Sequence, residues 1–261
     1  MERTRGLKDK TILITGGCGD IGGTMTRKLA ELGARVIIFD LLNKKAGEAR
    51  TRELDGAAYR KVDQGNANQV QEAVAAVARK FKRLDVVIGN AGIGPGGNVL
   101  DLTESEWVEV LRVNLIGCAM LAKAALKAML GQPIDAGGIR GKILFTSSWV
   151  GDFPSPGADG YCVSKAGLNH LTRLIAQRHA PDRILANAVA PGILKAGLTK
   201  NVAFRRAPGL REKLQSYIPL VEFGTAEQVA DAFVYLCSPE SNYMTGHIMV
   251  VDGGCTLTKR A

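Results

Sequence analysis

The stretch Thr11-Ile12-Leu13-Ile14-Thr15-Gly16-Gly17-Cys18-Gly19-Asp20-Ile21-Gly22-Gly23 decides the fold of this 261-residue chain. Its first five residues form a short apolar run that predicts a buried strand. Gly17, Gly19 and Gly22 fit the spacing GxGxxG, a weak signal alone but a stronger one between a strand and a helix. Glycines at such a turn let the backbone approach a pyrophosphate, which then lies at the helix N-terminus. The stretch predicts a nucleotide site, although a tight turn without a ligand would use the same glycines.

Short β-branched runs alternate with longer amphipathic segments along the rest of the chain. This pattern is typical of a parallel sheet covered by helices on both faces. The expected strands span 11–15, 35–40, 57–62, 84–89, 141–147, 184–190 and 247–251, and the expected helices span 21–32, 43–54, 67–80, 104–130, 159–179 and 226–237. We predict an α/β fold, with a single doubly wound Rossmann domain over residues 1–261 and a parallel seven-stranded sheet. The stretch 192–217 is too long for an ordinary connection and is a candidate substrate lid.

Composition is that of a soluble globular protein, with 46% hydrophobic and 23% charged residues. The five cysteines are scattered and form no CxxC pair, so we expect no disulfide framework, no metal site and a reducing cytoplasm. The apolar stretch 110–130 is interrupted by charged and amide side chains, which favours a packed helix over a membrane span. The net charge of +9 is spread along the chain. We therefore expect a solvated basic surface and no nucleic-acid partner.

The second predicted strand ends at Asp40, a carboxylate that follows the glycine turn by one strand and one helix. A carboxylate at this place accepts hydrogen bonds from a ribose 2′-hydroxyl and repels a 2′-phosphate. No Arg or Lys stands at positions 41–43 or in the glycine turn. The sequence therefore favours NAD over NADP as cofactor, although Asp40 would also suit a helix cap.

Tyr161 and Lys165 stand four residues apart in a segment predicted to be helical, so both side chains share one helix face. A fixed cation beside a phenol favours the phenolate, which suits a general acid or base that works near neutral pH. A lone pair with this spacing is more often a surface tyrosine and a solvated lysine. The neighbouring motifs decide between these interpretations.

Taken together, these residues resemble the short-chain dehydrogenase/reductase family over essentially the whole chain. Thr15-Gly16 to Gly22 is similar to the family's TGxxxGxG, and Gly89-Asn90-Ala91-Gly92 is similar to its NNAG. The further matching motifs, in chain order, are Val62-Asp63, Asn114, Ser148, Pro191-Gly192, Met244-Thr245-Gly246 and Val251-Asp252-Gly253-Gly254. Because the motifs occur in the family's order, we interpret the chain as a member of it.

Three positions depart from the family's pattern. Asp20 stands at the middle glycine of TGxxxGxG, and since a pyrophosphate would repel its carboxylate, we expect it to point outward or to cap the helix. Gly89 replaces the first Asn of NNAG and removes a side chain that braces neighbouring turns. Ala196 stands where the family often has a Thr, for which Thr199 is a possible substitute.

The resemblance implies hydride transfer to or from a nicotinamide, in which the protein positions the substrate and manages one proton. Tyr161 would exchange that proton, and Lys165 would favour the phenolate and hold the cofactor ribose. Ser148 would donate a hydrogen bond to the substrate oxygen. Its neighbour Ser147 is a competitor, but the spacing to Tyr161 favours Ser148. Asn114 would bind a water that carries the proton to solvent.

These roles define two further sets of expected site residues beside the catalytic Asn114, Ser148, Tyr161 and Lys165. The expected cofactor-binding residues are Gly16, Gly19, Asp20, Ile21, Gly22, Asp40, Asp63, Asn90, Gly92, Tyr161, Lys165, Pro191, Gly192 and Ile193. The expected substrate-binding residues are Ser148, Trp149, Phe153 and Tyr161.

The activity that we expect is the NAD(H)-dependent interconversion of a secondary alcohol, cyclic or aryl-substituted, and its ketone. Aromatic residues in the predicted pocket and lid, such as Trp149 and Phe153, favour such a substrate. The alternative is a 3-oxoacyl-carrier or coenzyme A ester reductase, which the basic lid residues would suit: Lys195, Lys200, Arg205, Arg206, Arg211 and Lys213. The remote alternative is a non-catalytic NAD(H)-sensing protein, which should have lost Tyr161 or Lys165.

The resemblance also implies how the chain assembles. Family members form homotetramers, and the corresponding contacts here would use the predicted helices 104–130 and 159–179 and the C-terminal strand. Small residues on the second helix, among them Ala166 and Gly167, would allow close helix contact.

Overall fold

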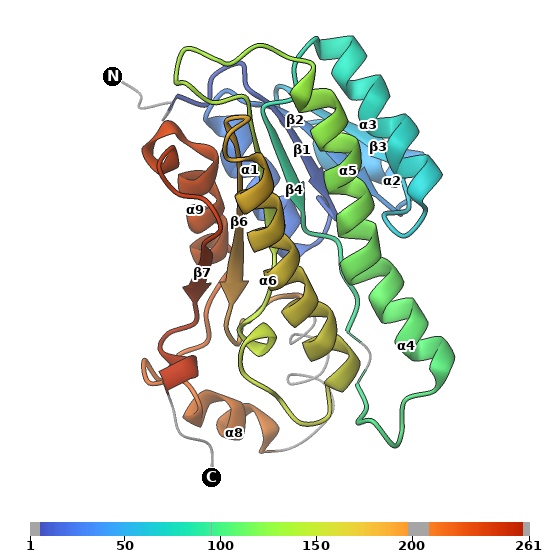
Figure 1. The fold of residues 1–261 in the computed structure, drawn as a ribbon. Helices are drawn as coiled ribbons and strands as arrows, with labels where there is room; N and C mark the ends of the chain where they lie inside the picture. The colour runs from blue at the N-terminus through green and yellow to red at the C-terminus, as the bar shows by residue number, and fades with distance from the viewer. Residues whose placement is uncertain (1–5, 95, 198–208, 258–261) are drawn as a thin grey trace.

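The computed structural model describes residues 6–94, 96–197 and 209–257. Seven parallel strands form one sheet in the order β3-β2-β1-β4-β5-β6-β7. The strands are β1 (Thr11–Thr15), β2 (Arg35–Asp40), β3 (Ala57–Lys61), β4 (Val86–Gly89), β5 (Gly141–Thr146), β6 (Ile184–Pro191) and β7 (Ile248–Val251). After β3 the chain crosses back to place β4 beside β1 (Figure 1). This reversal of strand order opens a crevice at the carboxyl ends of β1 and β4, where such sheets bind ligands.

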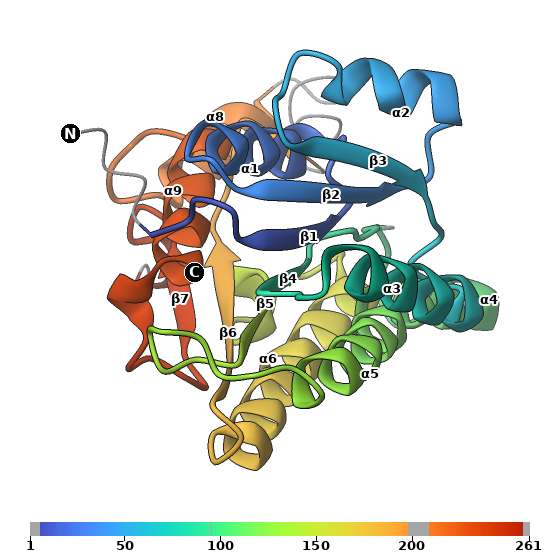
Figure 2. The ribbon, with the colours of Figure 1, turned by 90° about the horizontal axis from the view of Figure 1, so that it is seen from above.

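Helices cover both faces of the sheet, as the view from above shows (Figure 2). On one face lie α1 (Asp20–Glu31) and α9 (Ala226–Cys237), which pack against each other, with α2 (Lys44–Thr51) beside β3. On the other lie α3 (Ala67–Phe81), α5 (Gly117–Leu130) and α6 (Asp159–His179). Two shorter helices, α4 (Glu104–Leu111) and α8 (Leu210–Ser216), lie towards the carboxyl ends of the strands (Figure 1). The predicted fold class is therefore confirmed.

Alternate residues of each central strand contribute to the cores on the two faces. In β1, Ile12 and Ile14 pack in the core beneath α1 and α9, whereas Leu13 packs in the core beneath α3, α5 and α6. In β2, Ile37 and Phe39 likewise face the second core. Because both faces are covered, strands of this kind read as continuous apolar runs rather than as alternating ones.

Most predicted elements agree with the structure, and β1, β2, α6 and α9 begin and end at the expected residues. Strand β4 begins two residues later than expected. The side chain of Gln132 accepts from Leu84 N at 3.0 Å and donates to Leu84 O at 2.9 Å. Both backbone groups of Leu84 thus bond to this side chain, whereas in a strand they would bond to the backbone of a neighbouring strand. Helix α8 lies within the candidate lid 192–217, where the sequence predicts no helix, and none of its seven residues is buried. A helix without a buried face leaves little periodicity in the sequence.

The predicted helix 104–130 is interrupted by a π-helical turn, η1 (Arg112–Ile116), between α4 and α5. By length and composition, residues 104–130 are apolar enough to cross a membrane. In the fold, however, Leu121, Ala125 and Met129 on the inner side are fully buried in the core of the domain. This stretch is therefore a covering helix of the sheet.

Two glycines of the turn after β1 differ in how much space surrounds them. A Cβ atom on Gly22 would lie 2.1 Å from Gly16 O, a distance that no real side chain tolerates, whereas a Cβ on Gly19 would lie 3.5 Å from the same oxygen, in ordinary contact. Gly16 itself has φ +63°, in the left-handed region that favours glycine. Gly22 therefore lets α1 approach the end of β1.

We predict that Gly22→Ala lowers the free energy of unfolding by about 2–3 kcal/mol, because the added methyl group must push α1 away from the turn. The matched variant Gly19→Ala should stay within about 0.5 kcal/mol of wild type. Urea unfolding followed by circular dichroism measures both values. Equal losses in the two variants would contradict this account of the turn.

Candidate active site

The glycine turn fits a dinucleotide pyrophosphate. It closes through hydrogen bonds from Gly16 N to Phe39 O (2.7 Å) and from Gly19 N to Gly16 O (3.2 Å). Helix α1 then begins at Asp20, preceded by Gly19, which has no side chain to cap the helix. The first N–H groups of a helix attract anions, and the bare glycine backbone leaves room for phosphate oxygens to approach them. The expected residues Gly16, Gly19, Ile21 and Gly22 thus lie together in one tight turn.

Asp40 lies at the carboxyl end of β2, directly beside this turn. Its Oδ2 accepts from Cys18 N at 3.0 Å, and its Oδ1 accepts from Leu41 N at 2.7 Å. It does not cap α2, because Asn43 does so by accepting from Ala46 N. The carboxylate is thereby fixed in orientation and keeps acceptor capacity on Oδ2 for a ribose hydroxyl. Burial, with the Asp40 charge adding to it, raises the pKa of the Cys18 thiol to about 11.

Asp20 is exposed and points outward, which is one of its two expected placements. It does not cap helix α1, whose N-cap residue is Gly19 and which has no side-chain cap. Instead, Asp20 Oδ2 accepts a hydrogen bond of 3.0 Å from Gly197 N, at the start of the predicted lid. The residue that replaces the family's glycine therefore joins the cofactor turn to the segment after β6. Ala196, next to this contact, is buried, and Thr199 lies outside the described residues.

Tyr161 and Lys165 lie in the first two turns of α6, on the face that packs against the end of β5. Lys165 is 3% exposed, and its Nζ donates to Thr146 O at 2.7 Å. The same Nζ lies 5.4 Å from the centre of the Tyr161 ring. A buried ammonium needs hydrogen-bond partners, and the strand-end carbonyl holds this one beside the phenol.

Asn114 is fully buried in the π-helical turn. Its Oδ1 accepts from Ile93 N at 2.9 Å, and its Nδ2 donates to Ile93 O at 2.8 Å and to Ser164 Oγ at 3.1 Å. Such turns are frequent at functional sites because they shift side chains out of the ordinary helical register. A Cβ on Gly92 would lie 3.2 Å from Asn114 Oδ1 and 3.7 Å from Lys165 Nζ. The structure therefore brings Asn114, Gly92 and Lys165 together.

Ser148 and Ser147 follow β5 but have different partners. The Oγ of Ser147 donates to Asn169 Oδ1 at 2.5 Å and is 2% exposed. The Oγ of Ser148 accepts a long hydrogen bond of 3.4 Å from Val150 N, which uses a lone pair and leaves the hydroxyl proton to be donated. The turn that follows, Trp149–Gly151, packs closely against α6, because a Cβ on Gly151 would lie 3.0 Å from Lys165 O. Ser148 is therefore the serine that suits a substrate oxygen.

The expected substrate residues separate into two groups. Trp149 is buried in an apolar cluster with Ile193, Ile218 and Phe223, and Tyr161 packs against that cluster. Phe153, by contrast, is 44% exposed and does not belong to this cluster in the described part of the chain. Phe153 N donates to Trp149 O at 3.2 Å, so Phe153 stands directly beside the turn 149–151 with its side chain partly at the surface.

The remaining expected cofactor residues lie at the same edge of the sheet. Asn90 Nδ2 donates to Thr15 O (3.1 Å) and Gly16 O (3.2 Å), so it braces the glycine turn. A Cβ on Gly192 would lie 2.5 Å from Asp252 Cα, so the turn after Pro191 needs glycine. Asp63 accepts from Gly65 N at 2.8 Å. Within the described ranges, no three His, Cys, Asp or Glu side chains gather as metal ligands.

Sequence reasoning missed Gln64, which is 4% exposed and bonds to three segments of this edge. The available signal was its position directly after Val62-Asp63, at the carboxyl end of a predicted strand, where polar side chains tend to serve the site.

Comparison with known proteins agrees with this geometry. Residues 18–256 match a family model described as enoyl-(acyl carrier protein) reductase. The 3-oxoacyl-[acyl-carrier-protein] reductase FabG of Thermotoga maritima is 34% identical over 256 residues, which cover 96% of this chain and 99% of that protein. The chain belongs to the short-chain dehydrogenase/reductase family. Oxidoreductase UcpA of Salmonella typhimurium is 32% identical, with 96% of each chain covered. The crystal structure of gox2181 matches with a TM-score of 0.89 at 31% identity, with 98% of each chain covered.

Membership in the short-chain dehydrogenase/reductase family makes the chain an oxidoreductase with a nicotinamide cofactor. The tight glycine turn at the start of α1 and the carboxylate of Asp40 beside it fit the pyrophosphate and ribose of such a cofactor. The four expected catalytic side chains also lie at the carboxyl edge of the sheet, so a nicotinamide and a substrate carbonyl can meet there. They are Asn114, Ser148, Tyr161 and Lys165.

We predict that Ser148→Ala lowers kcat by about 100-fold or more, because a hydrogen bond to the developing oxyanion is lost. Ser147→Ala should leave kcat within about threefold of wild type and lower the free energy of unfolding by about 1–3 kcal/mol, since it strips the buried Asn169 of its partner. Steady-state kinetics and thermal unfolding of both variants measure the two effects. A larger kcat loss in Ser147→Ala would reverse the assignment.

Proposed function

We propose that this oxidoreductase reduces the 3-oxo group of an acyl thioester, carried by an acyl carrier protein or by coenzyme A, to the 3-hydroxyl. Relatives named 3-oxoacyl-[acyl-carrier-protein] reductase, 30–34% identical and covered over nearly their whole length, support this substrate class. Exposed cations on the segment after β6 support it as well. This segment packs against the Trp149 cluster through Leu214 of α8. Its exposed Lys195, Arg211 and Lys213 would favour an anionic carrier.

A cyclic or aryl-substituted ketone is the second candidate. Trp149 and Tyr161 share an apolar cluster that would suit it. The other residue expected to bind such a ketone, Phe153, is 44% exposed, and the names of the relatives, which support the thioester, give the ketone no comparable support. The acyl thioester is therefore the better-supported substrate.

The proposed mechanism assigns one role to each polar side chain. When bound beside the site, a reduced nicotinamide would supply the hydride for the carbonyl carbon. Ser148 donates a hydrogen bond to the carbonyl oxygen, and Tyr161 gives that oxygen its phenolic proton. Lys165, held by Thr146 O at 2.7 Å, keeps a positive charge beside the phenol as negative charge develops on it. Asn114 donates to Ile93 O and to Ser164 Oγ, and the Ser164 hydroxyl in turn donates to Tyr161 O, which ties Asn114 to the start of α6.

The proposed cofactor is NAD(H). Asp40 is held by three backbone N–H groups, from Cys18, Leu41 and Leu42, with its carboxylate beside the glycine turn. A fixed negative charge at this place repels the 2′-phosphate of NADP(H) and accepts from the 2′-hydroxyl of NAD(H).

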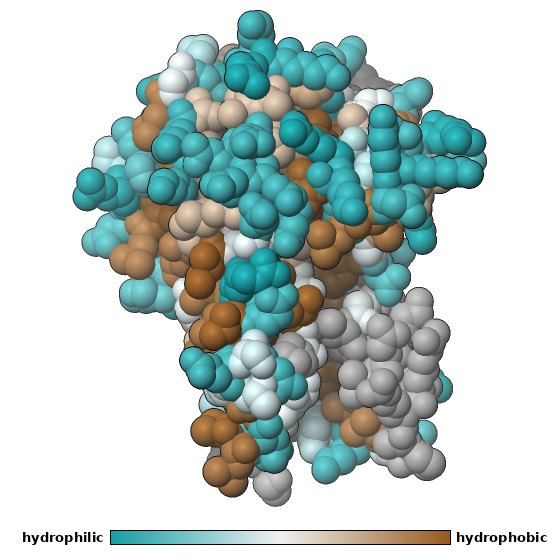
Figure 3. Space-filling model, turned by 90° about the vertical axis from the view of Figure 1, so that its right-hand side faces the viewer, coloured by the Kyte–Doolittle hydropathy of each residue, from teal (hydrophilic) through white to brown (hydrophobic). Residues whose placement is uncertain are grey.

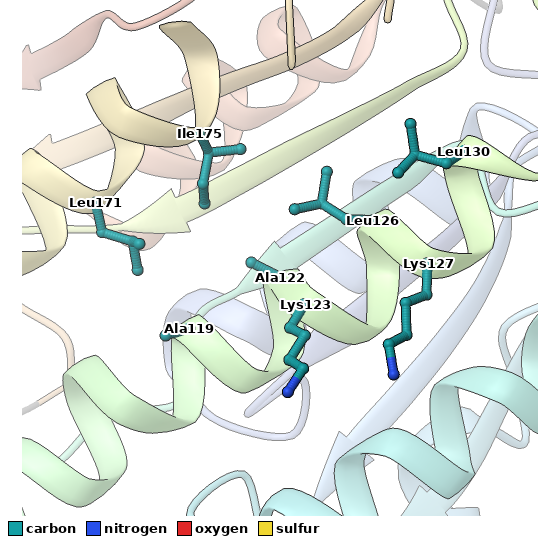
Figure 4. Close-up of a pocket in the computed structure, with 8 residues that line it drawn as sticks. All are labelled: Ala119, Ala122, Lys123, Leu126, Lys127, Leu130, Leu171 and Ile175. Carbon is teal, nitrogen blue, oxygen red and sulfur yellow. The ribbon is translucent and has the colours of Figure 1, made fainter. Parts of the chain in front are cut away.

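We also propose that the chain forms a homotetramer in the cytoplasm. An apolar groove of about 320 Å³ runs between α5 and α6, lined by Ala119, Ala122, Lys123, Leu126, Lys127, Leu130, Leu171 and Ile175. In Figure 4 the leucines of α5 point towards α6, while Lys123 and Lys127 point away from it. Figure 3 shows the face on the right-hand side of Figure 1, where apolar side chains gather towards the left edge and at the lower end. Ile116, Leu130 and Leu174 are about half exposed beside the groove, and a second copy would cover them.

The proposed place in the cytoplasm is supported by the cysteines. All five are free, as suits a reducing compartment.

The function is tested by measuring initial rates with acetoacetyl coenzyme A and with a panel of cyclic and aryl ketones, each with NADH and NADPH. We expect the highest kcat/KM with the thioester and NADH, and Tyr161→Phe as control should lose turnover by about 1,000-fold or more, since general acid catalysis is removed. A higher kcat/KM with a ketone would favour the second candidate. A clear preference for NADPH would overturn the role of Asp40, and tight NADH binding without any turnover would favour a sensing protein.

For assembly, we expect Leu174→Glu to reduce the native mass measured by light scattering after size-exclusion chromatography. The change places a charge in the proposed interface, where its desolvation is costly. Leu174 is half exposed in the protomer, so the fold should persist. The control Leu100→Glu, at a loop residue that is 95% exposed, should leave the mass unchanged. An unchanged mass in Leu174→Glu would rule out this face.

A further inference from the structure

Gln64 occupies a central position beneath the site. It follows β3, is 4% exposed, and its amide contacts three segments that are distant in sequence. The hydroxyl of Thr15, at the end of β1, donates to Gln64 Oε1 at 2.5 Å. Gln64 Nε2 donates to Ala91 O, after β4, and to Val113 O, in the π-helical turn, both at 2.9 Å.

The direction of these hydrogen bonds is fixed by chemistry. Both carbonyl oxygens can only accept, so the NH₂ group must face them. The Thr15 hydroxyl accepts from Asn90 N (2.9 Å) and Ala91 N (3.1 Å), which leaves its proton for Gln64 Oε1. Neither a carboxylate nor an apolar side chain of the same size would satisfy this set of partners.

Gln64 thereby holds the two segments that carry catalytic and cofactor groups. Ala91 is held at its N–H through Thr15 and at its carbonyl by Gln64 itself. Val113 directly precedes Asn114, which binds both backbone groups of Ile93. Gly92 is thus clamped between a contact at residue 91 and a contact at residue 93. A shift of this loop would move the backbone next to Lys165 Nζ, which a Cβ on Gly92 would approach to 3.7 Å.

The neighbouring strand end provides no side chain for this task. Gly89 ends β4, and a Cβ there would lie 2.8 Å from Phe145 Cδ1 and 3.2 Å from Cys118 Sγ. Gln64 Nε2 lies 3.7 Å from the same Cys118 Sγ. Phe145 and Cys118 occupy the space that a side chain at residue 89 would need. The loop after β4 is therefore held by Gln64, which reaches it from the end of β3.

We infer that Gln64 is a positioning residue of the active site, which sets the relative placement of the loop 90–93 and of Asn114 by binding Ala91 O and Val113 O. It does not contact the reacting atoms. The inference depends on the proposed function only for its kinetic readout, and it holds for whichever carbonyl the enzyme reduces.

The structure offers a matched control. Gln132 is also a buried glutamine, 6% exposed, whose amide bonds to the backbone of Leu84 and Arg140. It lies at the amino end of β4, opposite the site. Gln64→Met and Gln132→Met remove the same kinds of hydrogen bond while filling a similar volume.

We expect Gln64→Met to lower kcat by about 10- to 100-fold, as small misplacements in a preorganised site do, while Gln132→Met keeps kcat within about twofold of wild type. Both should lower the thermal midpoint by similar amounts, which controls for a general loss of stability. Rates are measured with the best substrate of the wild-type enzyme. Equal kcat losses in the two variants, or an unchanged kcat in Gln64→Met, would overturn the inference.

Hydrogen–deuterium exchange of the cofactor-free protein tests the inference independently of activity. We expect faster exchange in peptides covering 90–94 and 112–117 in Gln64→Met, and no change there in Gln132→Met. If Gln64→Met fails to fold, Gln64→Asn, which keeps the amide but shortens its reach, takes its place in both measurements. Unchanged exchange in these peptides would overturn the inference even if the enzyme acts on another substrate than proposed.

Discussion

The parallel pairing of β1 with β4 is the constraint on which the rest of the structure depends. With Ile14 opposite Ile88, both strands end at the same level of the sheet. Thr15 therefore meets the N–H groups of Asn90 and Ala91, and the Asn90 amide reaches back to Gly16 O. The glycine turn and the loop after β4 become one unit, and the cofactor and proton-transfer halves of the site are built on its two sides.

The proton-transfer half depends on a buried cation. An ammonium is costly to bury unless it is hydrogen-bonded, and Thr146 O, at the end of β5, meets this need for Lys165 at 2.7 Å. The same bond draws the start of α6 towards the sheet and so places Tyr161. The π-helical turn does the corresponding work for Asn114, whose amide bonds to Ile93 on one side and to Ser164 on the other. Hydrogen bonds to backbone thus hold the site in place before any ligand binds.

The apolar cluster around Trp149 is built differently. It joins a short turn, Trp149–Gly151, to Ile193, Ile218 and Phe223, which come from connections between elements. Such connections vary more freely than strand ends. One fold therefore serves relatives with names as different as 3-oxoacyl-[acyl-carrier-protein] reductase and oxidoreductase UcpA. Family membership carries the chemistry over to this chain, whereas the substrate must come from these connections.

The sequence by itself determined what rests on local pattern: the seven strands, the glycine turn, Asp40 at a strand end, and Tyr161 and Lys165 on one helix face. Spacing suffices for these, because each feature is contained in one element or in two neighbouring ones. Only the tertiary structure decided that Asp20 binds Gly197 N, that Ser147 donates to Asn169, and that Gln64 joins three segments. Each of these depends on contacts between residues far apart in the chain, which local periodicity does not encode.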